Sequence, residues 1–261
     1  DWFDQSKQPV VISAEDGIQL HGWLFDPDCA GAKPHLYAIC CHGYSGQPQD
    51  MAKYAHRFAR LGFTVLVPAL RGHGLSEGRY AGMGWLDRRD LMRWISLIIG
   101  SDADARILLQ GKSMGAAAVM MTVGEPDLPR NVVAAVEDCG YASVGQQFID
   151  CARSMFHLPK FLAKPIVTTM GAIARRRAGY GFQEASCVEQ LKHATIPMLF
   201  IHGGADDFVP SRALDENFDA CASIDRQKLL IPSAGHSMSA STAPVVYWKT
   251  VTNFVTRVFG L

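Results

Sequence analysis

The sequence predicts an α/β protein in which helices cover both faces of one mostly parallel sheet. Short runs rich in β-branched and aromatic residues alternate along the chain with segments of helical periodicity. Most of these runs are continuously apolar, which is typical of strands buried on both faces. A chain of 261 residues is long enough for one sizeable core of this class.

The N-terminal half begins with two strands and then alternates. Residues 9–13 and 18–25 are expected to form an antiparallel hairpin at one edge of the sheet. Strands and helices are then predicted in alternation at residues 35–41, 51–62, 63–69, 85–99, 106–111 and from about Ser113 onward. This alternation favours parallel pairing of the later strands.

One segment interrupts the rhythm after the strand at 132–138. More than fifty residues follow without a convincing strand, and a structureless loop of that length is unusual in a compact domain. We therefore expect residues 141–194 to form a helical cap, inserted into a core made of residues 1–140 and 195–261. The remaining core elements are predicted at residues 197–203, 211–222, 228–234 and 245–260. A cap over the sheet implies an enclosed pocket.

The charged residues balance, with 25 basic and 25 acidic side chains and no net charge. This balance gives no reason to expect nucleic acid or an anionic surface as a partner of the whole protein. We expect a small or neutral ligand instead. The sequence makes no prediction of the oligomeric state.

The seven cysteines are an odd number and lack the spacing of a metal site. We interpret them as reduced and mostly buried, which is typical of a reducing compartment, and therefore expect a cytoplasmic protein. No stretch approaches the roughly 20 apolar residues that span a bilayer. The chain starts at Asp1 rather than at a methionine, which leaves room for an N-terminal anchor or signal before it.

The stretch LLQGKSMGAAA, residues 108–118, contains the pattern G-x-S-x-G around Ser113. The pattern alone arises readily by chance. Here, however, it lies between a predicted strand and a predicted helix, as a nucleophile elbow requires. Gly111 and Gly115 lack the side chains that so tight a turn excludes. Ser113 is therefore a candidate nucleophile, provided that a base lies within reach.

Candidate partners for Ser113 follow two later strands. Ligands of open parallel sheets bind at the carboxyl ends of the strands. His236, in SAGHS, supplies a base there, and Asp206, in HGGADDFVP, supplies the carboxylate that orients it. The chain order Ser, Asp, His is that of α/β-hydrolases. Asp207 and the strand-end Asp138 remain alternatives for the acid, although Asp138 is expected to cap the first cap helix.

The oxyanion formed at an attacked carbonyl needs two N–H donors. The elbow supplies the backbone N–H of Met114. The loop HGYSG after the third strand supplies the second donor, which we assign to the N–H of Tyr44, with the N–H of Ser45 as the alternative.

Six segments along the chain resemble, in content and in chain order, the bacterial α/β-hydrolase family of serine esterase-like proteins, in its dienelactone-hydrolase-like or prolyl-oligopeptidase-like branch. They are LLQGKSMGAAA, CCHGYSGQ, PALRGHGLSEGRYAGMGWLDRRDL, VEDCGYASV, IHGGADDFVP and PSAGHSMS. The resemblance covers the chain from about residue 8. It implies an α/β-hydrolase fold, with Ser113, Asp206 and His236 as the triad and Tyr44 and Met114 at the oxyanion. The family spacing D-x-x-V-P matches Asp206 rather than Asp207.

Apolar residues flank the triad motifs and are expected to line the substrate pocket. They are Phe208, Val209 and Met238, beside Tyr44 and Met114. From the cap, Met155, Phe156, Phe161 and Met170 are candidates to face inward. Such a lining favours an apolar acyl or aryl group.

The sequence thus predicts a serine hydrolase that cleaves small carboxylic esters through an acyl-enzyme, without a metal or other cofactor. A peptidase or amidase with the same triad, or a ligand-binding protein with little turnover, are the alternatives. Arg71 is expected to brace a loop. His202 near Asp206 lacks a third metal ligand. The run of arginines at 175–177 makes the cap basic, and a solvated cap face is favoured over contact with a lipid surface.

Overall fold

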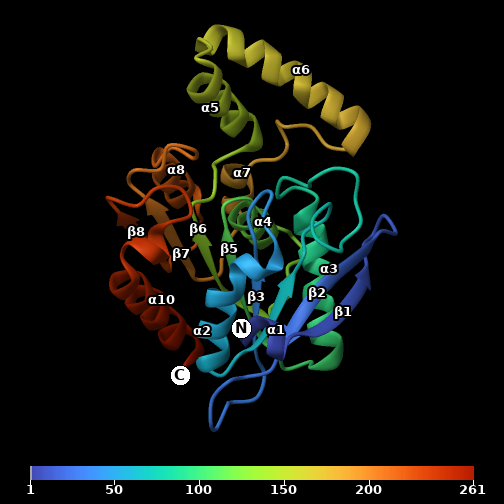
Figure 1. Ribbon diagram of the computed structural model, residues 1–261, viewed down its shortest axis with the longest axis vertical. Helices are drawn as coiled ribbons and strands as arrows, with labels where there is room; N and C mark the ends of the chain where they lie inside the picture. Colours follow the sequence, from blue (N-terminus) through green and yellow to red (C-terminus); the bar gives the residue numbers. More distant parts are fainter. Residues whose placement is uncertain (1) are drawn as a thin grey trace.

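The computed structural model describes residues 2–261 and contains one eight-stranded sheet (Figure 1). The strand order is β1-β2-β4-β3-β5-β6-β7-β8. Strand β2 runs antiparallel to both β1 and β4, and all other neighbours are parallel. The strands are β1 (Gln8–Ser13), β2 (Gln19–Phe25), β3 (Leu36–Cys41), β4 (Thr64–Pro68), β5 (Arg106–Lys112), β6 (Val132–Asp138), β7 (Met198–Gly203) and β8 (Arg226–Ile231). The predicted mostly parallel sheet with an antiparallel edge hairpin is confirmed.

Helices cover both faces of the sheet, as Figure 1 shows. The helices of the core are α1 (Trp2–Ser6), α2 (Ala52–Arg60), α3 (Asp87–Ser101), α4 (Met114–Val123), α7 (Cys187–Leu191), α8 (Arg212–Ala220), α9 (Ser239–Thr242) and α10 (Pro244–Phe259), with a 3-10 turn, η1, at Pro48–Met51. The sequence did not indicate α1, η1 or α9, because helices of four or five residues are too short to show a period.

Alternating side chains of the strands build two separate cores. In β5, Ile107 and Leu109 belong to a buried cluster that also contains side chains of α3, α4, α7 and α8, whereas Leu108 belongs to a second cluster, which contains side chains of α2 and α10. Trp94 of α3 and Tyr247 of α10 are among the large side chains buried on the two faces. Because both faces are covered, the central strands need apolar residues at every position. The polar groups that the strands carry therefore gather at their ends.

Two long helices stand beyond the carboxyl ends of the strands, where Figure 1 shows them as a hairpin. They are α5 (Val144–Phe156) and α6 (Lys160–Ala178). The following helix α7 lies within the predicted cap segment, yet it returns to the core and packs on α4 and α8. The two stems of the hairpin meet, because Ser143 and Ser186 form an antiparallel bridge and the Val144 N–H donates to the Ala185 carbonyl at 2.9 Å.

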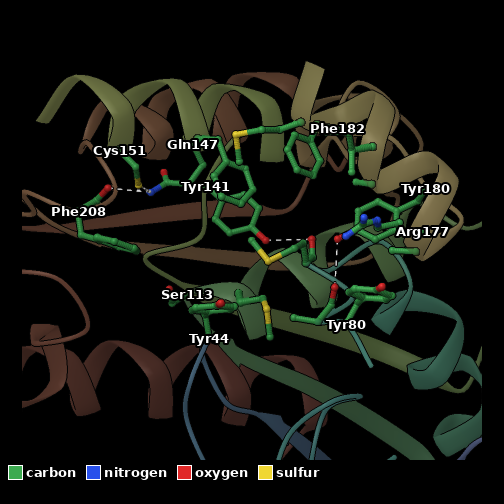
Figure 2. A pocket seen from close by; sticks show the side chains of 18 residues that line it. Tyr44, Tyr80, Ser113, Tyr141, Gln147, Cys151, Arg177, Tyr180, Phe182 and Phe208 are labelled. Carbon is green, nitrogen blue, oxygen red and sulfur yellow. Dashed lines mark hydrogen bonds between the residues drawn. The ribbon is translucent and has the colours of Figure 1, made fainter. Parts of the chain in front are cut away.

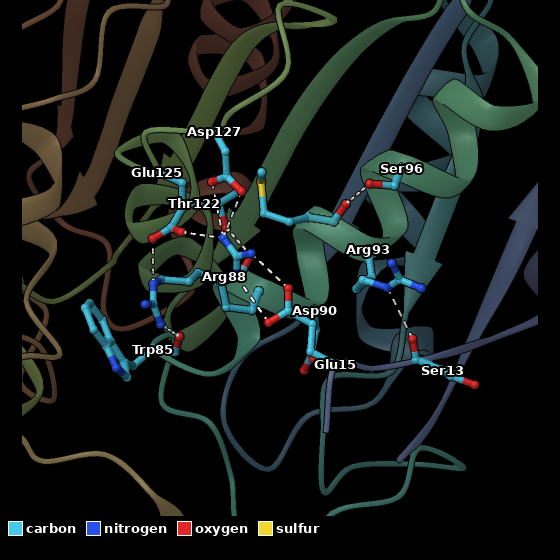
Figure 3. A network of polar contacts seen from close by, with 12 residues as sticks. Ser13, Glu15, Trp85, Arg88, Asp90, Arg93, Ser96, Thr122, Glu125 and Asp127 are labelled. Carbon is cyan, nitrogen blue, oxygen red and sulfur yellow. Dashed lines mark hydrogen bonds and ion pairs between the residues drawn. The ribbon is translucent and has the colours of Figure 1, made fainter. Parts of the chain in front are cut away.

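A polar network holds α3 against the loop after α4 (Figure 3). Glu125 accepts from Arg88 at 2.7 Å and from Arg89 at 2.8 Å. Arg89 also binds Glu15, in the turn between β1 and β2, at 2.8 Å. The buried bidentate pair of Arg71 with Asp90, at 2.7 Å, braces the loop after β4 on the same helix, as the sequence predicted for Arg71. These contacts fix the neighbours of α4, the helix that follows Ser113.

Candidate active site

Ser113 occupies the sharp turn between β5 and α4 with φ 55° and ψ −118°. A serine rarely adopts a positive φ, so the surrounding chain must impose this conformation. A Cβ on Gly115 would lie 2.3 Å from the carbonyl oxygen of Cys41, and one on Gly111 would lie 2.3 Å from that of Gly115. Both positions therefore require glycine, and the elbow lifts the Ser113 hydroxyl to the end of the sheet.

A chain of hydrogen bonds joins the three predicted triad side chains. Ser113 Oγ lies 2.9 Å from Nε2 of His236, and Nδ1 of His236 lies 2.8 Å from Oδ2 of Asp206. A carboxylate can only accept, so Nδ1–H donates to Asp206 and Nε2 is free to accept from the serine hydroxyl. The residues follow β5, β7 and β8, whose carboxyl ends share one edge of the sheet. This arrangement can take a proton from Ser113.

Asp206 is held as a carboxylate by its surroundings. Its Oδ1 accepts from the backbone N–H groups of Phe208 at 3.0 Å and Val209 at 2.8 Å. Burial alone would raise the pKa of Asp206, but hydrogen bonds from His202 and His236 outweigh it and hold the pKa well below its usual value. The negative charge that orients His236 is therefore present throughout the physiological pH range.

The two alternative acids lie elsewhere. Asp207 is exposed, while Asp206 beside it is buried. Asp138 accepts from the hydroxyl of Tyr247 at 2.9 Å, and burial raises its pKa to about 6. The expectation that Asp138 caps the first cap helix is wrong, because Ser143 caps α5.

The loop after β3 lies against the elbow. A Cβ on Gly43 would lie 3.3 Å from Cβ of Ser113, so the backbone of this loop borders the nucleophile. The Gly43 carbonyl accepts from Nδ1–H of His42 at 2.8 Å and from the Gly46 N–H at 3.0 Å. In a trans peptide the N–H points opposite to the carbonyl, so the Tyr44 N–H points away from His42. Met114 opens α4, where N–H groups lack partners within the helix.

A cavity of about 450 Å³ opens beside Ser113 and lies between the core and the α5–α6 hairpin, and Figure 2 shows the side chains that line it. Its lining is mostly aromatic and aliphatic. The lining residues are Tyr44, Tyr80, Ala81, Met83, Ser113, Met114, Tyr141, Gln147, Phe148, Cys151, Met170, Ile173, Ala174, Arg177, Ala178, Tyr180, Phe182 and Phe208. Tyr141 and Tyr180 present rings rather than free hydroxyls, because their hydroxyls donate to backbone carbonyls at 2.9 and 3.1 Å.

Residues 32–172 match the model of the family described as serine aminopeptidase, S33, over more than half of the chain. The chain belongs to the S33 hydrolase family. The uncharacterized protein YqkD of Bacillus subtilis is 26% identical over 97% of this chain and 81% of its own. The uncharacterized Rv2307c of Mycobacterium tuberculosis is 29% identical over 87% of this chain and 72% of its own.

Solved structures agree with this assignment in fold. The Pyrococcus furiosus esterase Pf2001 superposes with a TM-score of 0.77 at 20% identity, covering 97% of this chain and 92% of that chain. The α/β-hydrolase fold that the motifs implied is therefore confirmed. Within residues 2–261 of this S33 hydrolase, no helix is long and apolar enough to cross a membrane.

The residues predicted to line the pocket of the S33 hydrolase divide into two groups. Phe208 lines the cavity, and its ring centroid lies 5.0 Å from that of His236. Val209 and Met238 lie outside the lining. Val209 is buried, its N–H donating to Asp206 and its carbonyl accepting from His202 at 3.0 Å, and Met238 is half-exposed beside α9. Neighbours of a triad residue in a loop thus face different directions.

The cap supplies cavity residues that the sequence did not single out. Gln147 of α5 donates from Nε2 to the Phe208 carbonyl at 2.8 Å, as Figure 2 shows, and so ties the cap to the loop of Asp206. Of the cap residues expected to face inward, Met170 lines the cavity, whereas Met155, Phe156 and Phe161 are exposed. The helical period shows which apolar residues share a face of a helix, but it does not show which face of the hairpin meets the core.

One group of potential metal ligands coincides with the triad. Cys139, Asp206 and His236 bring ligand atoms within 4.8 Å of one another. Burial raises the pKa of the Cys139 thiol well above its usual value, so the sulfur stays protonated and is a poor ligand. The nearest atoms of Asp206 and His236 already share a hydrogen bond. This chemistry fits a proton relay better than a metal centre.

Proposed function

We propose that this S33 hydrolase cleaves carboxylic esters with an apolar acyl or aryl group through an acyl-enzyme intermediate. The observation that carries the proposal is the hydrogen-bonded series Ser113, His236 and Asp206 at the wall of an apolar cavity. A nucleophile, a base and an orienting carboxylate are the groups that acyl transfer needs.

In the first half of the reaction, Ser113 Oγ forms a bond to the carbonyl carbon of the ester while its proton passes to Nε2 of His236. The carbonyl electron pair moves onto the oxygen. When this tetrahedral species collapses, the bond to the alcohol oxygen breaks, and the leaving alkoxide takes the proton from Nε2. The alcohol departs, and the acyl group stays on Ser113.

In the second half, water replaces the alcohol. Nε2 of His236 takes a proton from the water as its oxygen bonds to the acyl carbon. Collapse breaks the bond to Ser113 Oγ, which recovers its proton from Nε2, and the carboxylic acid leaves. Asp206 keeps Nδ1 protonated and stabilises the imidazolium in both halves.

The N–H groups of Met114 and Tyr44 stabilise the oxyanion in both tetrahedral species. Two features support this assignment. Met114 N–H lies at the N-terminus of α4, whose dipole favours negative charge. The hydrogen bond from His42 fixes the direction of the Gly43 carbonyl, and the Tyr44 N–H of the same trans peptide points the opposite way. Losing one such donor typically lowers kcat by roughly 100- to 1,000-fold.

The cavity favours an ester over the N-terminus of a peptide. An aminopeptidase, which the family description names, must accept an α-ammonium group, and carboxylates are the usual acceptors for such a cation. Among the described residues that line the cavity there is no carboxylate, and the one charged side chain is the cation Arg177. The structurally similar Pf2001 is named an esterase. Peptide or amide cleavage is therefore the second candidate.

The test compares the wild-type protein with Ser113→Ala on p-nitrophenyl esters from acetate to dodecanoate. We expect the wild type to favour medium or long acyl chains and Ser113→Ala to lose at least about 1,000-fold in kcat. A fluorophosphonate probe should label wild-type Ser113. Wild-type rates in Ser113→Ala would refute the proposal. Faster cleavage of an amide with the same acyl group favours the peptidase, and an unlabelled folded protein favours a binding protein.

A further inference from the structure

Large apolar side chains are exposed where α5 meets α6. Met155, Phe156 and Phe161 are 63%, 70% and 74% exposed, and Leu162 is 44% exposed. We call residues 153–164 the hairpin tip. Figure 1 places this end of the hairpin at the extremity of the molecule, beyond the carboxyl ends of the strands. Large apolar side chains that are exposed together at one end of a helical hairpin are typical of an interaction surface rather than of ordinary solvent-facing positions.

The same hairpin carries an unbalanced positive charge. Residues 151–183 contain no acidic side chain and six basic ones, in a chain whose net charge is zero. Arg153, Lys160 and Lys164 in the hairpin tip have no ion-pair partner among residues 2–261. Apolar residues flanked by unpaired cations complement a surface with an apolar interior and anionic headgroups.

An apolar stripe connects the hairpin tip with the cavity. Leu162, Ile166, Met170 and Ile173 follow one another at spacings of four, four and three residues, so they share one side of α6. All four are exposed by more than a third, and Met170 and Ile173 also line the cavity beside Ser113. The stripe therefore extends from the hairpin tip to side chains that line the same cavity as Ser113.

We propose that the hairpin tip docks on an anionic lipid surface and that the stripe admits esters from that surface to Ser113. Phe156, Phe161 and their neighbours enter the interface, while Lys160 and Lys164 contact the headgroups. The docking itself is independent of the chemistry. The delivery of substrate rests on the proposed ester hydrolysis and narrows its substrates to esters that partition into lipid.

Sedimentation with vesicles tests the docking. We expect the full chain to bind vesicles of phosphatidylcholine and phosphatidylglycerol in equal parts, to bind pure phosphatidylcholine more weakly, and to release from the mixed vesicles at high salt. The double variant Phe156→Ser/Phe161→Ser should bind the mixed vesicles at least about tenfold more weakly, because burial of these rings supplies much of the affinity.

A double variant that removes two lysine charges distinguishes the headgroup contact from the insertion of the phenylalanine rings. Lys160→Gln/Lys164→Gln should weaken binding to the mixed vesicles about tenfold and leave binding to pure phosphatidylcholine unchanged. Matched controls lie on α10, far from the cap in Figure 1, where Val245 is 78% exposed and Lys249 is exposed. Val245→Ser and Lys249→Gln should bind like the wild type.

Several outcomes would overturn the docking. The first is failure of the wild type to bind mixed vesicles, and the second is an equal loss of binding in the α10 controls. The third is a concentration-dependent dimer, without vesicle binding, that the phenylalanine variant abolishes. That result would assign the hairpin tip to a second copy of the chain. Hydrolysis of a water-soluble short ester should stay within twofold of wild type in the phenylalanine variant, which shows that it is folded. If vesicle binding persists while Ser113 proves inert toward all esters, the docking stands and the proposed function fails.

Discussion

Nε2 of His42 accepts a hydrogen bond of 3.1 Å from the backbone N–H of Leu70. The same buried ring donates from Nδ1 to the Gly43 carbonyl at 2.8 Å. Only a neutral imidazole protonated at Nδ1 makes both bonds. Burial lowers the pKa of His42 to about 4, so the ring is neutral at physiological pH. His42 thus joins the loops after β3 and β4 and sets the peptide that carries the Tyr44 N–H.

This depressed pKa predicts an acid-dependent stability difference between the wild type and His42→Phe. As pH falls from about 6.5 to about 4, His42 is protonated in the unfolded protein but stays neutral in the folded protein. Protonation therefore favours the unfolded wild type, whereas the variant has no such group and does not lose this stability. We expect the advantage of the wild type to shrink by about 3 kcal/mol between pH 7.5 and pH 4.5. Urea unfolding at both pH values measures it, and parallel pH profiles for the two proteins contradict it.

The Asp206 carboxylate should control the tautomer of His236. In Asp206→Asn the amide can donate to Nδ1, which leaves the proton on Nε2 and removes the base from Ser113. We expect kcat to fall by roughly 10,000-fold with little change in the melting temperature. Asp207→Asn is the matched control, because Asp207 is exposed at the next position, and it should keep kcat within twofold. A comparable loss in the control would assign the acid to Asp207.

The bond from Gln147 to the Phe208 carbonyl should hold the cap over the cavity. Gln147→Leu preserves side-chain length but leaves that carbonyl unpaired, which costs about 1 kcal/mol of stability. We expect KM for a medium-chain ester to rise several-fold with a smaller change in kcat. Gln146→Leu, one position earlier on α5 and outside the cavity lining, should leave KM unchanged. Equal KM values in the two variants would show that the contact does not shape the binding site.

The elbow should tolerate no side chain at Gly115. A methyl group there would lie 2.3 Å from the carbonyl oxygen of Cys41, on the neighbouring strand, so Gly115→Ala must displace β3 or α4. We expect several kcal/mol of destabilisation and loss of folded protein. Gly100→Ala is the control, since no atom beyond the adjacent residues and the nearby backbone of its own helix lies within 4 Å of the added carbon, and alanine favours helix α3 by up to about 1 kcal/mol. A folded Gly115→Ala with a wild-type melting temperature, measured by circular dichroism, would contradict the packing at the elbow.

The sequence predicted the arrangement of the triad because the sheet itself brings it together. Ser113, Asp206 and His236 each follow a strand, and parallel strands end at one edge, so strand periodicity and chain order suffice. The strained elbow was also predictable from the sequence, because one glycine lies two positions before the serine and another two positions after it. In each case a local pattern determines the position.

The contacts of the cap could not be predicted from the sequence in the same way. Gln147 reaches the Phe208 carbonyl, and Met170 reaches the cavity, only because of the angle at which the hairpin crosses the core. Phenylalanine is usually buried, yet Phe156 and Phe161 are 70% and 74% exposed. Periodicity reports which residues of a helix share a face, whereas the partner of that face depends on packing over long distances in the chain.

The bridge between Ser143 and Ser186 has a consequence for how such proteins diversify. Because the inserted helices leave and rejoin the core at adjacent points, their length and sequence can change without moving a strand or the proposed triad. The core can then keep its chemistry while evolution exchanges the hairpin for another. An exchanged hairpin would bring its own selectivity and its own place of action. The core would still supply the capacity to react.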